Sequence, residues 1–157
     1  MSLFWQSLTA GVAFGIWPLF MNKSGFGGYS SAAVFSGLVF LGTLSFALKE
    51  WGASQSNILW LMIITLGLLG SVLSKAPAQN IGWGMAFAAG FFGIIGLMFW
   101  SGTLANATNK NIGSLFVIML VAQIAVPALY QAAILGQYSP RRIVGFLAAI
   151  LAAYLLK

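Results

Sequence analysis

The sequence predicts an all-α fold, a polytopic transmembrane helix bundle of about six spans, with five spans also possible. Hydrophobic residues make up 61% of the 157-residue chain, and charged residues make up only 5%. An ordinary soluble domain carries about 25% charged residues. A chain this apolar cannot cover a water-facing surface with polar groups, so we expect a single integral membrane domain over residues 1–157.

Six apolar runs underlie this prediction. A bilayer span needs about 20 mostly apolar residues, with a range of roughly 17–25. The runs are Leu3–Met21, Ser30–Leu48, Asn57–Ser74, Gly82–Ala105, Ile112–Leu135 and Arg141–Leu156. Backbone groups in lipid must find hydrogen-bond partners inside the protein, and the runs lack the alternating pattern of barrel strands. Each run is therefore expected to be a helix.

Short breaks separate the runs and explain where each helix should end. In order they read NKSGFGGYS, KEWGASQS, KAPAQN, NATNKN and GQYSP, all rich in turn residues. None is long enough to form a soluble domain. No basic residue precedes the first run and no small-residue cleavage site follows it, so we expect this run to stay as the first span.

Basic residues in short loops favour the cytoplasmic side of a membrane. With six spans, one side holds Lys49, Lys110 and Lys157, and the other holds Lys23, Lys75, Arg141 and Arg142. This bias of four to three places the arginine loop in the cytoplasm and both termini outside. The alternative is a barely specified orientation, in which copies insert both ways and pair antiparallel.

The composition excludes several classes of function. The chain has no cysteine and no histidine, and Glu50 is its single acidic residue. We therefore expect no catalytic group, no metal site and no cofactor, and we do not expect an enzyme. The basic residues are spread along the chain rather than gathered in a stripe, which also argues against nucleic-acid binding.

Small residues follow helical spacing in three runs and predict faces where helices approach closely. One face lies in the fourth run, one in the first run and one begins in the last run. In that order the residues are Gly82, Ala86, Ala89, Gly93 and Gly96; Gly11 and Gly15; and Gly145. These faces serve either packing within the chain or a seam between two copies.

Polar groups inside a span are the best pointers to a transport path. Gln123 lies in the middle of the fifth run, and Pro127 follows one turn later. Because proline has no amide hydrogen, it frees a carbonyl near Gln123 and is expected to kink or open the helix. Asn22 and Trp17 flank a second proline in the first run, so these four residues form the predicted substrate path. Alternatively, the prolines only bend their helices and the amides bond to neighbouring groups.

Several short motifs resemble an EamA-type repeat of the drug/metabolite transporter superfamily. The stretch GTLANAT, the mid-helix Pro127 and the turn with Gly136, Ser139 and Pro140 before Gly145 are similar to the end of such a repeat. The stretch AFGIWPLFMNKSG is similar to its first helix. The resemblance implies a small-molecule transporter in a cell membrane, in bacteria the inner membrane.

The sequence also departs from that family. The glutamate of the family's turn is Gln137 here, and Asn57–Ser74 is a surplus run beside the five helices of the repeat. Family members usually carry two inverted repeats, so the resemblance implies that a single repeat works as a homodimer, which is antiparallel if the family's inversion is kept. A non-transporting membrane scaffold, or an accessory subunit of a larger complex, remains the alternative function.

The first and fourth runs share a similar stretch. FGIWPLF covers residues 14–20 and FGIIGLMF covers residues 92–99, at similar depths in the two runs. A three-helix unit repeated twice would be inverted, because three is odd. Such a three-helix repeat would give the chain internal symmetry of its own, apart from the symmetry of a homodimer.

We predict that the Arg141–Arg142 loop lies in the cytoplasm. Because the chain lacks cysteine, Ser2→Cys and Ser139→Cys each introduce a single thiol. A membrane-impermeant maleimide added to intact cells should label the Ser2→Cys variant and leave the Ser139→Cys variant unlabelled. Labelling of Ser139→Cys alone would establish the reverse orientation, and labelling of both would establish a mixed one.

Overall fold

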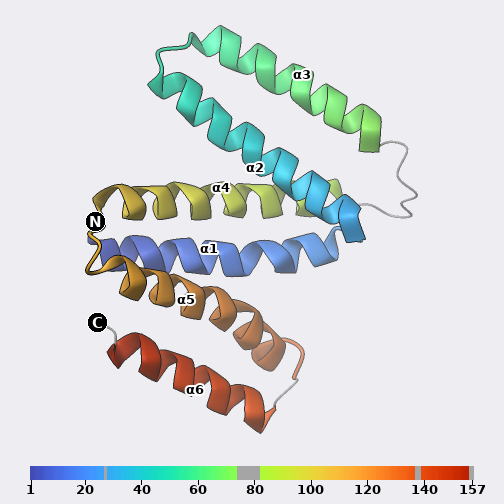
Figure 1. Cartoon of the computed structure of the whole chain (residues 1–157). Coiled ribbons are helices and arrows are strands. Elements are labelled where there is room, and N and C mark those ends of the chain that lie inside the picture. The colour runs from blue at the N-terminus through green and yellow to red at the C-terminus, as the bar shows by residue number, and fades with distance from the viewer. Residues whose placement is uncertain (27, 74–81, 137–138, 156–157) are drawn as a thin grey trace. The chain divides into compact units, whose positions relative to one another are not determined.

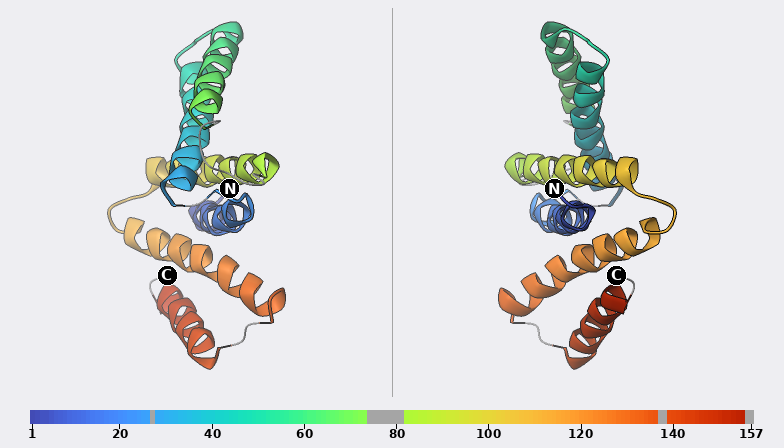
Figure 2. Two further views of the ribbon diagram at one scale, coloured as in Figure 1. Left: turned by 90° about the vertical axis from the view of Figure 1, so that its right-hand side faces the viewer. Right: turned by 90° about the vertical axis from the view of Figure 1, so that its left-hand side faces the viewer.

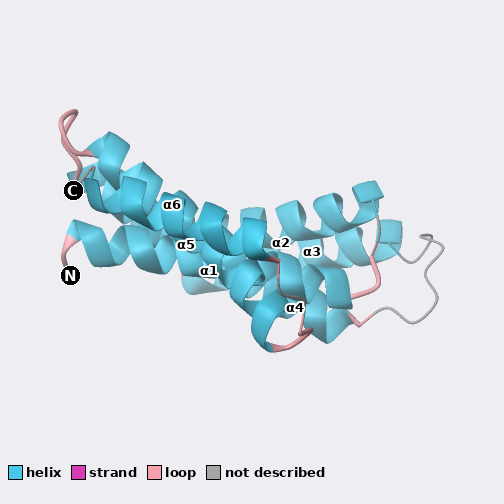
Figure 3. Cartoon of the chain, turned by 90° about the horizontal axis from the view of Figure 1, so that it is seen from below, coloured by secondary structure: helices cyan, strands magenta, loops and turns pink. Residues whose placement is uncertain are grey.

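A helix forms in each of the six predicted runs. The computed structural model describes residues 1–26, 28–73, 82–136 and 139–155. Its helices are α1 (Leu3–Lys23), α2 (Gly28–Glu50), α3 (Gln55–Leu73), α4 (Trp83–Asn106), α5 (Ile112–Ala133) and α6 (Pro140–Leu155) (Figure 1). The described residues form helices and loops, with no strand among them (Figure 3). The predicted all-α fold class is confirmed.

Four of the helices, α1, α2, α4 and α5, are long and apolar enough to cross a bilayer. Their surfaces suit lipid rather than water, since Phe91 on α4 and Ile124 on α5 are each 60% exposed. Within the described residues, α3 and α6 contribute shorter apolar stretches, Gln55–Thr65 and Ile143–Ala152. The chain is therefore an integral membrane protein, and the number of its membrane spans stays a prediction.

Glycine and proline set the helix ends in the breaks, as the sequence predicts. Gly25 and Gly136 follow α1 and α5 with φ angles of 79° and 62°, a left-handed conformation that costs glycine little. Pro140 begins α6, where its missing amide hydrogen leaves no helical bond unmade. Gly136 therefore follows the end of one helix and Pro140 starts the next.

The two prolines inside helices do not divide them. Pro18 lies within α1 and Pro127 within α5, and both helices continue as α-helix through the proline. The expected opening of these helices is thus not seen. Each proline instead leaves one carbonyl, four residues earlier, without its usual amide partner.

The chain divides into two compact units, and the division passes through α1 and α4. The first unit comprises Met1–Ile16 and Ile95–Lys157, and the second comprises Trp17–Ile94. In the first unit α5 and α6 are neighbours, and in the second unit α2 and α3 are neighbours (Figures 1 and 2). Each unit therefore combines one pair of consecutive helices with a part of α1 and one half of α4.

The second unit has a small apolar core. Met21, Phe26, Val34, Ala86 and Ala89 are buried in it, and Trp17, Phe20, Phe35 and Leu38 pack against it. At its edge the backbone amide of Gly82 donates to the carbonyl of Ser24 over 2.9 Å. This bond ties the residue before α4 to the end of α1.

Glycines on α4 bring that helix close to α2. A Cβ atom built on Gly93 would lie 2.6 Å from Val39, and one built on Gly90 would lie 2.7 Å from Leu38. The predicted small face therefore packs within the chain, with Ala86 and Ala89 fully buried. Gly82 is the exception, since it precedes α4 rather than lying on its face. Gly90 belongs to the contact although the sequence pattern did not include it.

We predict that Gly93→Leu destabilises the fold, because the added side chain would meet Val39 and Phe35 at 2.6–2.8 Å. Overpacking of this kind costs about 1–3 kcal/mol, which corresponds to roughly 2–12 °C in Tm for a chain of this size. Gly84→Leu on the same helix is the matched control, since no atom lies within 4 Å of a Cβ built there. Equal Tm values for the two variants in detergent would contradict the packing.

Candidate functional site

The first unit is organised around a backbone contact between α1 and α5. A Cβ atom built on Gly11 would overlap the carbonyl oxygen of Met119, and one built on Gly15 would lie 2.7 Å from the carbonyl oxygen of Gln123. Both pairs advance by four residues, so the two helices run parallel with one turn of α1 against one turn of α5. Only glycine on α1 allows so close an approach.

The proline of α5 acts at this contact. Pro127 cannot donate to the Gln123 carbonyl, which is four residues earlier. That carbonyl faces Gly15 of α1, so it is covered by protein. The glycine Cα–H groups face carbonyl oxygens, an arrangement that provides weak Cα–H···O attraction between helices. The Gln123 carbonyl, which was expected to belong to the substrate path, is therefore part of the packing between α1 and α5.

The side chain of Gln123 lies on another side of α5. It is half-buried, and its amide makes no hydrogen bond within the described chain. Phe116 lies seven residues earlier, which is two turns on the same helical face, and its ring packs 5.7 Å from that of Trp100 on α4. Gln123 thus projects toward the α4 side of α5.

The other two path residues, Trp17 and Asn22, belong to the second unit. The Trp17 ring stacks on Phe35 with ring centroids 3.8 Å apart and planes 18° apart. Asn22 is exposed near the end of α1. Trp17 therefore packs within the second unit. Neither Trp17 nor Asn22 belongs to the unit that contains Gln123.

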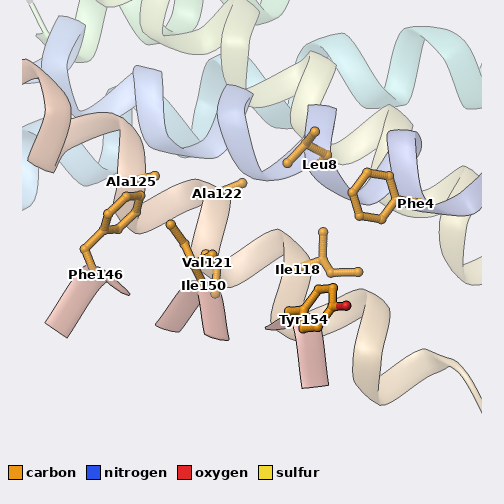
Figure 4. A pocket seen from close by; sticks show the side chains of 9 residues that line it. All are labelled: Phe4, Leu8, Ile118, Val121, Ala122, Ala125, Phe146, Ile150 and Tyr154. Atoms are coloured by element: carbon orange, nitrogen blue, oxygen red, sulfur yellow. The ribbon is translucent and has the colours of Figure 1, made fainter. Parts of the chain in front are cut away.

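A pocket opens between α1, α5 and α6, all within the first unit. Its volume is about 360 Å³, and its lining is shown in Figure 4. The lining residues are Phe4, Leu8, Ile118, Val121, Ala122, Ala125, Phe146, Ile150 and Tyr154. Phe4 and Tyr154 lie at one end and Phe146 at the other (Figure 4). Among these nine residues, Tyr154 alone has a polar side-chain atom.

The pocket and Gln123 occupy different faces of α5. Ile118, Ala122 and Ala125 are spaced by four and three residues and share the pocket face, whereas Gln123 is turned away from it by about 100° relative to Ala122. The pocket was not predicted from the sequence. The feature of the sequence that could have indicated this pocket is the spacing of Phe146, Ile150 and Tyr154, which repeats every four residues along α6.

Two other predicted residues lie at the surface of α6. Gly145 is exposed, and a Cβ built there meets no atom within 4 Å, so the predicted close packing at Gly145 is not found. The rotation of α6 about its own axis explains this. The face of α6 that carries Phe146 is turned toward α5, and Gly145 lies outside that face. Arg141 is exposed at the start of α6, and the side chain of Arg142 lies outside the described atoms.

Comparison with protein-family models, with curated proteins and with solved structures finds no match to this chain.

We predict that Gly15→Ala lowers Tm, because the new methyl group would meet the Gln123 carbonyl and Val126, each at 2.7 Å. Backbone cannot swing aside, so the helices must separate, and roughly 1–3 kcal/mol is lost. Gly145→Ala is the control, and its Tm should hold or rise, since alanine favours helix by about 1 kcal/mol over glycine. A Gly15→Ala variant as stable as Gly145→Ala would show that α1 does not touch α5.

Proposed function

We propose that the protein is a small-molecule transporter or permease for uncharged, largely apolar solutes, of the drug/metabolite transporter type. The observation that supports this most directly is the pocket between α1, α5 and α6. A volume of about 360 Å³ falls in the range of small-ligand sites, which are mostly apolar with a few polar groups. The aromatic and aliphatic lining, with the Tyr154 hydroxyl, suits an amphipathic molecule.

The distribution of charge supports an uncharged solute and a mechanism without a buried proton carrier. Glu50, the single acidic residue, is exposed at the end of α2. A cationic solute crossing the membrane would find no acidic side chain within the predicted spans. Facilitated diffusion or exchange needs none, so these modes form part of the proposal.

The proposal includes a cell membrane, the inner membrane in a bacterium, and a homodimer, as the sequence resemblance implies. α6 presents exposed apolar side chains that a lipid or a second copy would cover, among them Val144 at 65% and Leu147 at 58%. The size of the purified protein in lipid nanodiscs distinguishes a dimer from a monomer.

A scaffold or accessory subunit is the second candidate function, and one observation favours it. The α1–α5 contact is a close approach of backbones at Gly11 and Gly15, with the freed Gln123 carbonyl covered by Gly15. Such close packing beside Gln123, where a transport path was expected, favours a rigid membrane subunit. Transport measurements distinguish the two candidates.

We predict that Ala125→Leu abolishes transport by filling the pocket from α5. Hexyl glucoside, which is uncharged and has an apolar tail, is a suitable probe, and its radiolabelled form can be followed into proteoliposomes. Uptake by Ala125→Leu should fall to near the rate of protein-free liposomes while Tm holds. Ile124→Leu is the matched control, because Ile124 faces outward on the same helix at 60% exposure.

Gln123→Leu compares the two faces of α5 in the same assay. If the pocket carries the solute, Gln123→Leu transports like the wild type. A loss of uptake in Gln123→Leu, with Ala125→Leu unaffected, would move the path to the α4 side of α5. A wild type that transports neither hexyl glucoside nor other uncharged amphiphiles would favour the scaffold.

A further inference from the structure

A second cavity lies between the last two turns of α2 and the first turn of α3, inside the second unit. Its volume is about 410 Å³, which is larger than the 360 Å³ of the solute pocket. Its lining residues are Ser45, Phe46, Lys49, Ala53, Gln55 and Ile58. The two helices are neighbours along the chain and in space (Figure 1). Every residue of this lining therefore comes from one helical hairpin.

The end of α2 indicates the depth of this cavity in the membrane. The candidate span Tyr29–Glu50 ends beside the cavity, and Trp51 in the following turn is 74% exposed. The ends of spans, with their tryptophan residues, lie at the level of the lipid headgroups. We therefore expect the cavity at the depth where lipid phosphates meet acyl chains.

The turn between the two helices uses its own carbonyl groups. Gly52 has a φ angle of 81°, and its amide donates to the Lys49 carbonyl over 3.1 Å. The Ala53 amide donates to the Leu48 carbonyl over 2.9 Å. These two bonds form a Schellman motif at the end of α2. The carbonyls of Leu48 and Lys49 are therefore already paired beside the cavity.

Three lining residues carry polar side chains, and two of these side chains are unpaired. The Ser45 hydroxyl donates to the Leu41 carbonyl over 2.7 Å. The Lys49 amine and the Gln55 side-chain amide have no ion pair or hydrogen bond within the described chain, so their N–H donors and the lysine charge are free. The acidic Glu50 is exposed and does not line the cavity. The free groups therefore suit an anion whose oxygens accept hydrogen bonds.

The apolar part of the lining lies deeper than the polar part. Phe46 precedes Lys49 by three residues on α2, and Ile58 follows Gln55 by three residues on α3, so each helix contributes one polar and one apolar side chain to the cavity. In both pairs the polar residue is nearer the turn. Phe46 is 50% exposed and can be covered by an apolar chain. The cavity thus matches a ligand with an anionic end at the turn and an apolar end further along the helices.

We propose that this cavity binds an anionic phospholipid. Its phosphate is held by Lys49 and Gln55, and the start of an acyl chain lies along Phe46 and Ile58. A free phosphate shares the chemistry of the headgroup but would leave the apolar lining uncovered. The cavity and the solute pocket have no residue in common, so this site does not rest on the proposed transport function.

Native mass spectrometry of the full-length protein in detergent tests the site by counting bound phosphatidylglycerol molecules. Lys49→Gln should weaken binding of the first lipid by about fivefold, the effect of one basic residue beside an anionic lipid. Lys49→Arg should bind like the wild type. Lys110→Gln is the matched control, because Lys110 is also an exposed lysine in a short turn but lies outside this cavity. Equal losses in Lys49→Gln and Lys110→Gln would show general attraction between charges and overturn the site.

Two further ligands distinguish the lipid from a free phosphate. Phosphatidylcholine, which has no net charge, should bind the wild type more weakly than phosphatidylglycerol, and equal binding of the two lipids would reject an anion site. Glycerol 3-phosphate carries the anionic group without acyl chains. It should leave the bound lipid in place at the same concentration. Displacement of the lipid would assign the cavity to a soluble phosphate and overturn the phospholipid proposal.

Discussion

The close approach of helix backbones at glycine is the interaction on which the first unit depends. Lipid gives apolar helices no hydrophobic reason to associate, so their attraction comes from many short contacts between well-fitted surfaces. Gly11 and Gly15 provide such a surface against the carbonyls of Met119 and Gln123. The same contact covers the carbonyl that Pro127 leaves unpaired, so one feature satisfies packing and hydrogen bonding together.

The second unit uses the same device with different helices. In the first unit glycines of α1 contact α5, and in the second unit Gly90 and Gly93 of α4 contact α2. The boundaries between the units fall after Ile16 and after Ile94, the third residue of each FGI stretch. The two boundaries between the units therefore fall at equivalent positions of the similar stretches FGIWPLF and FGIIGLMF. Each unit consists of one pair of consecutive helices with parts of α1 and α4, as expected if a three-helix unit is repeated.

The sequence was sufficient to predict the helices and much of their packing, because the length of an apolar run and the spacing of small residues can be read directly from neighbouring positions in the chain. It correctly indicated that Gly93 is a close contact, but it included Gly145, which is exposed. Spacing places residues on one face of a helix and does not tell which face meets a neighbour. The pocket was missed for the same reason, since Leu8, Ala125 and Ile150 come from three helices.

The functional interpretation of α5 depends on its rotation about its own axis. One face, with Ala122, meets α1 and the pocket, while Gln123 is turned toward α4. A polar side chain in a span is a strong signal in sequence, yet an apolar pocket gives almost none, since its residues resemble those that face lipid. For a solute that is itself largely apolar, the residues that bind it are the ones that composition cannot distinguish.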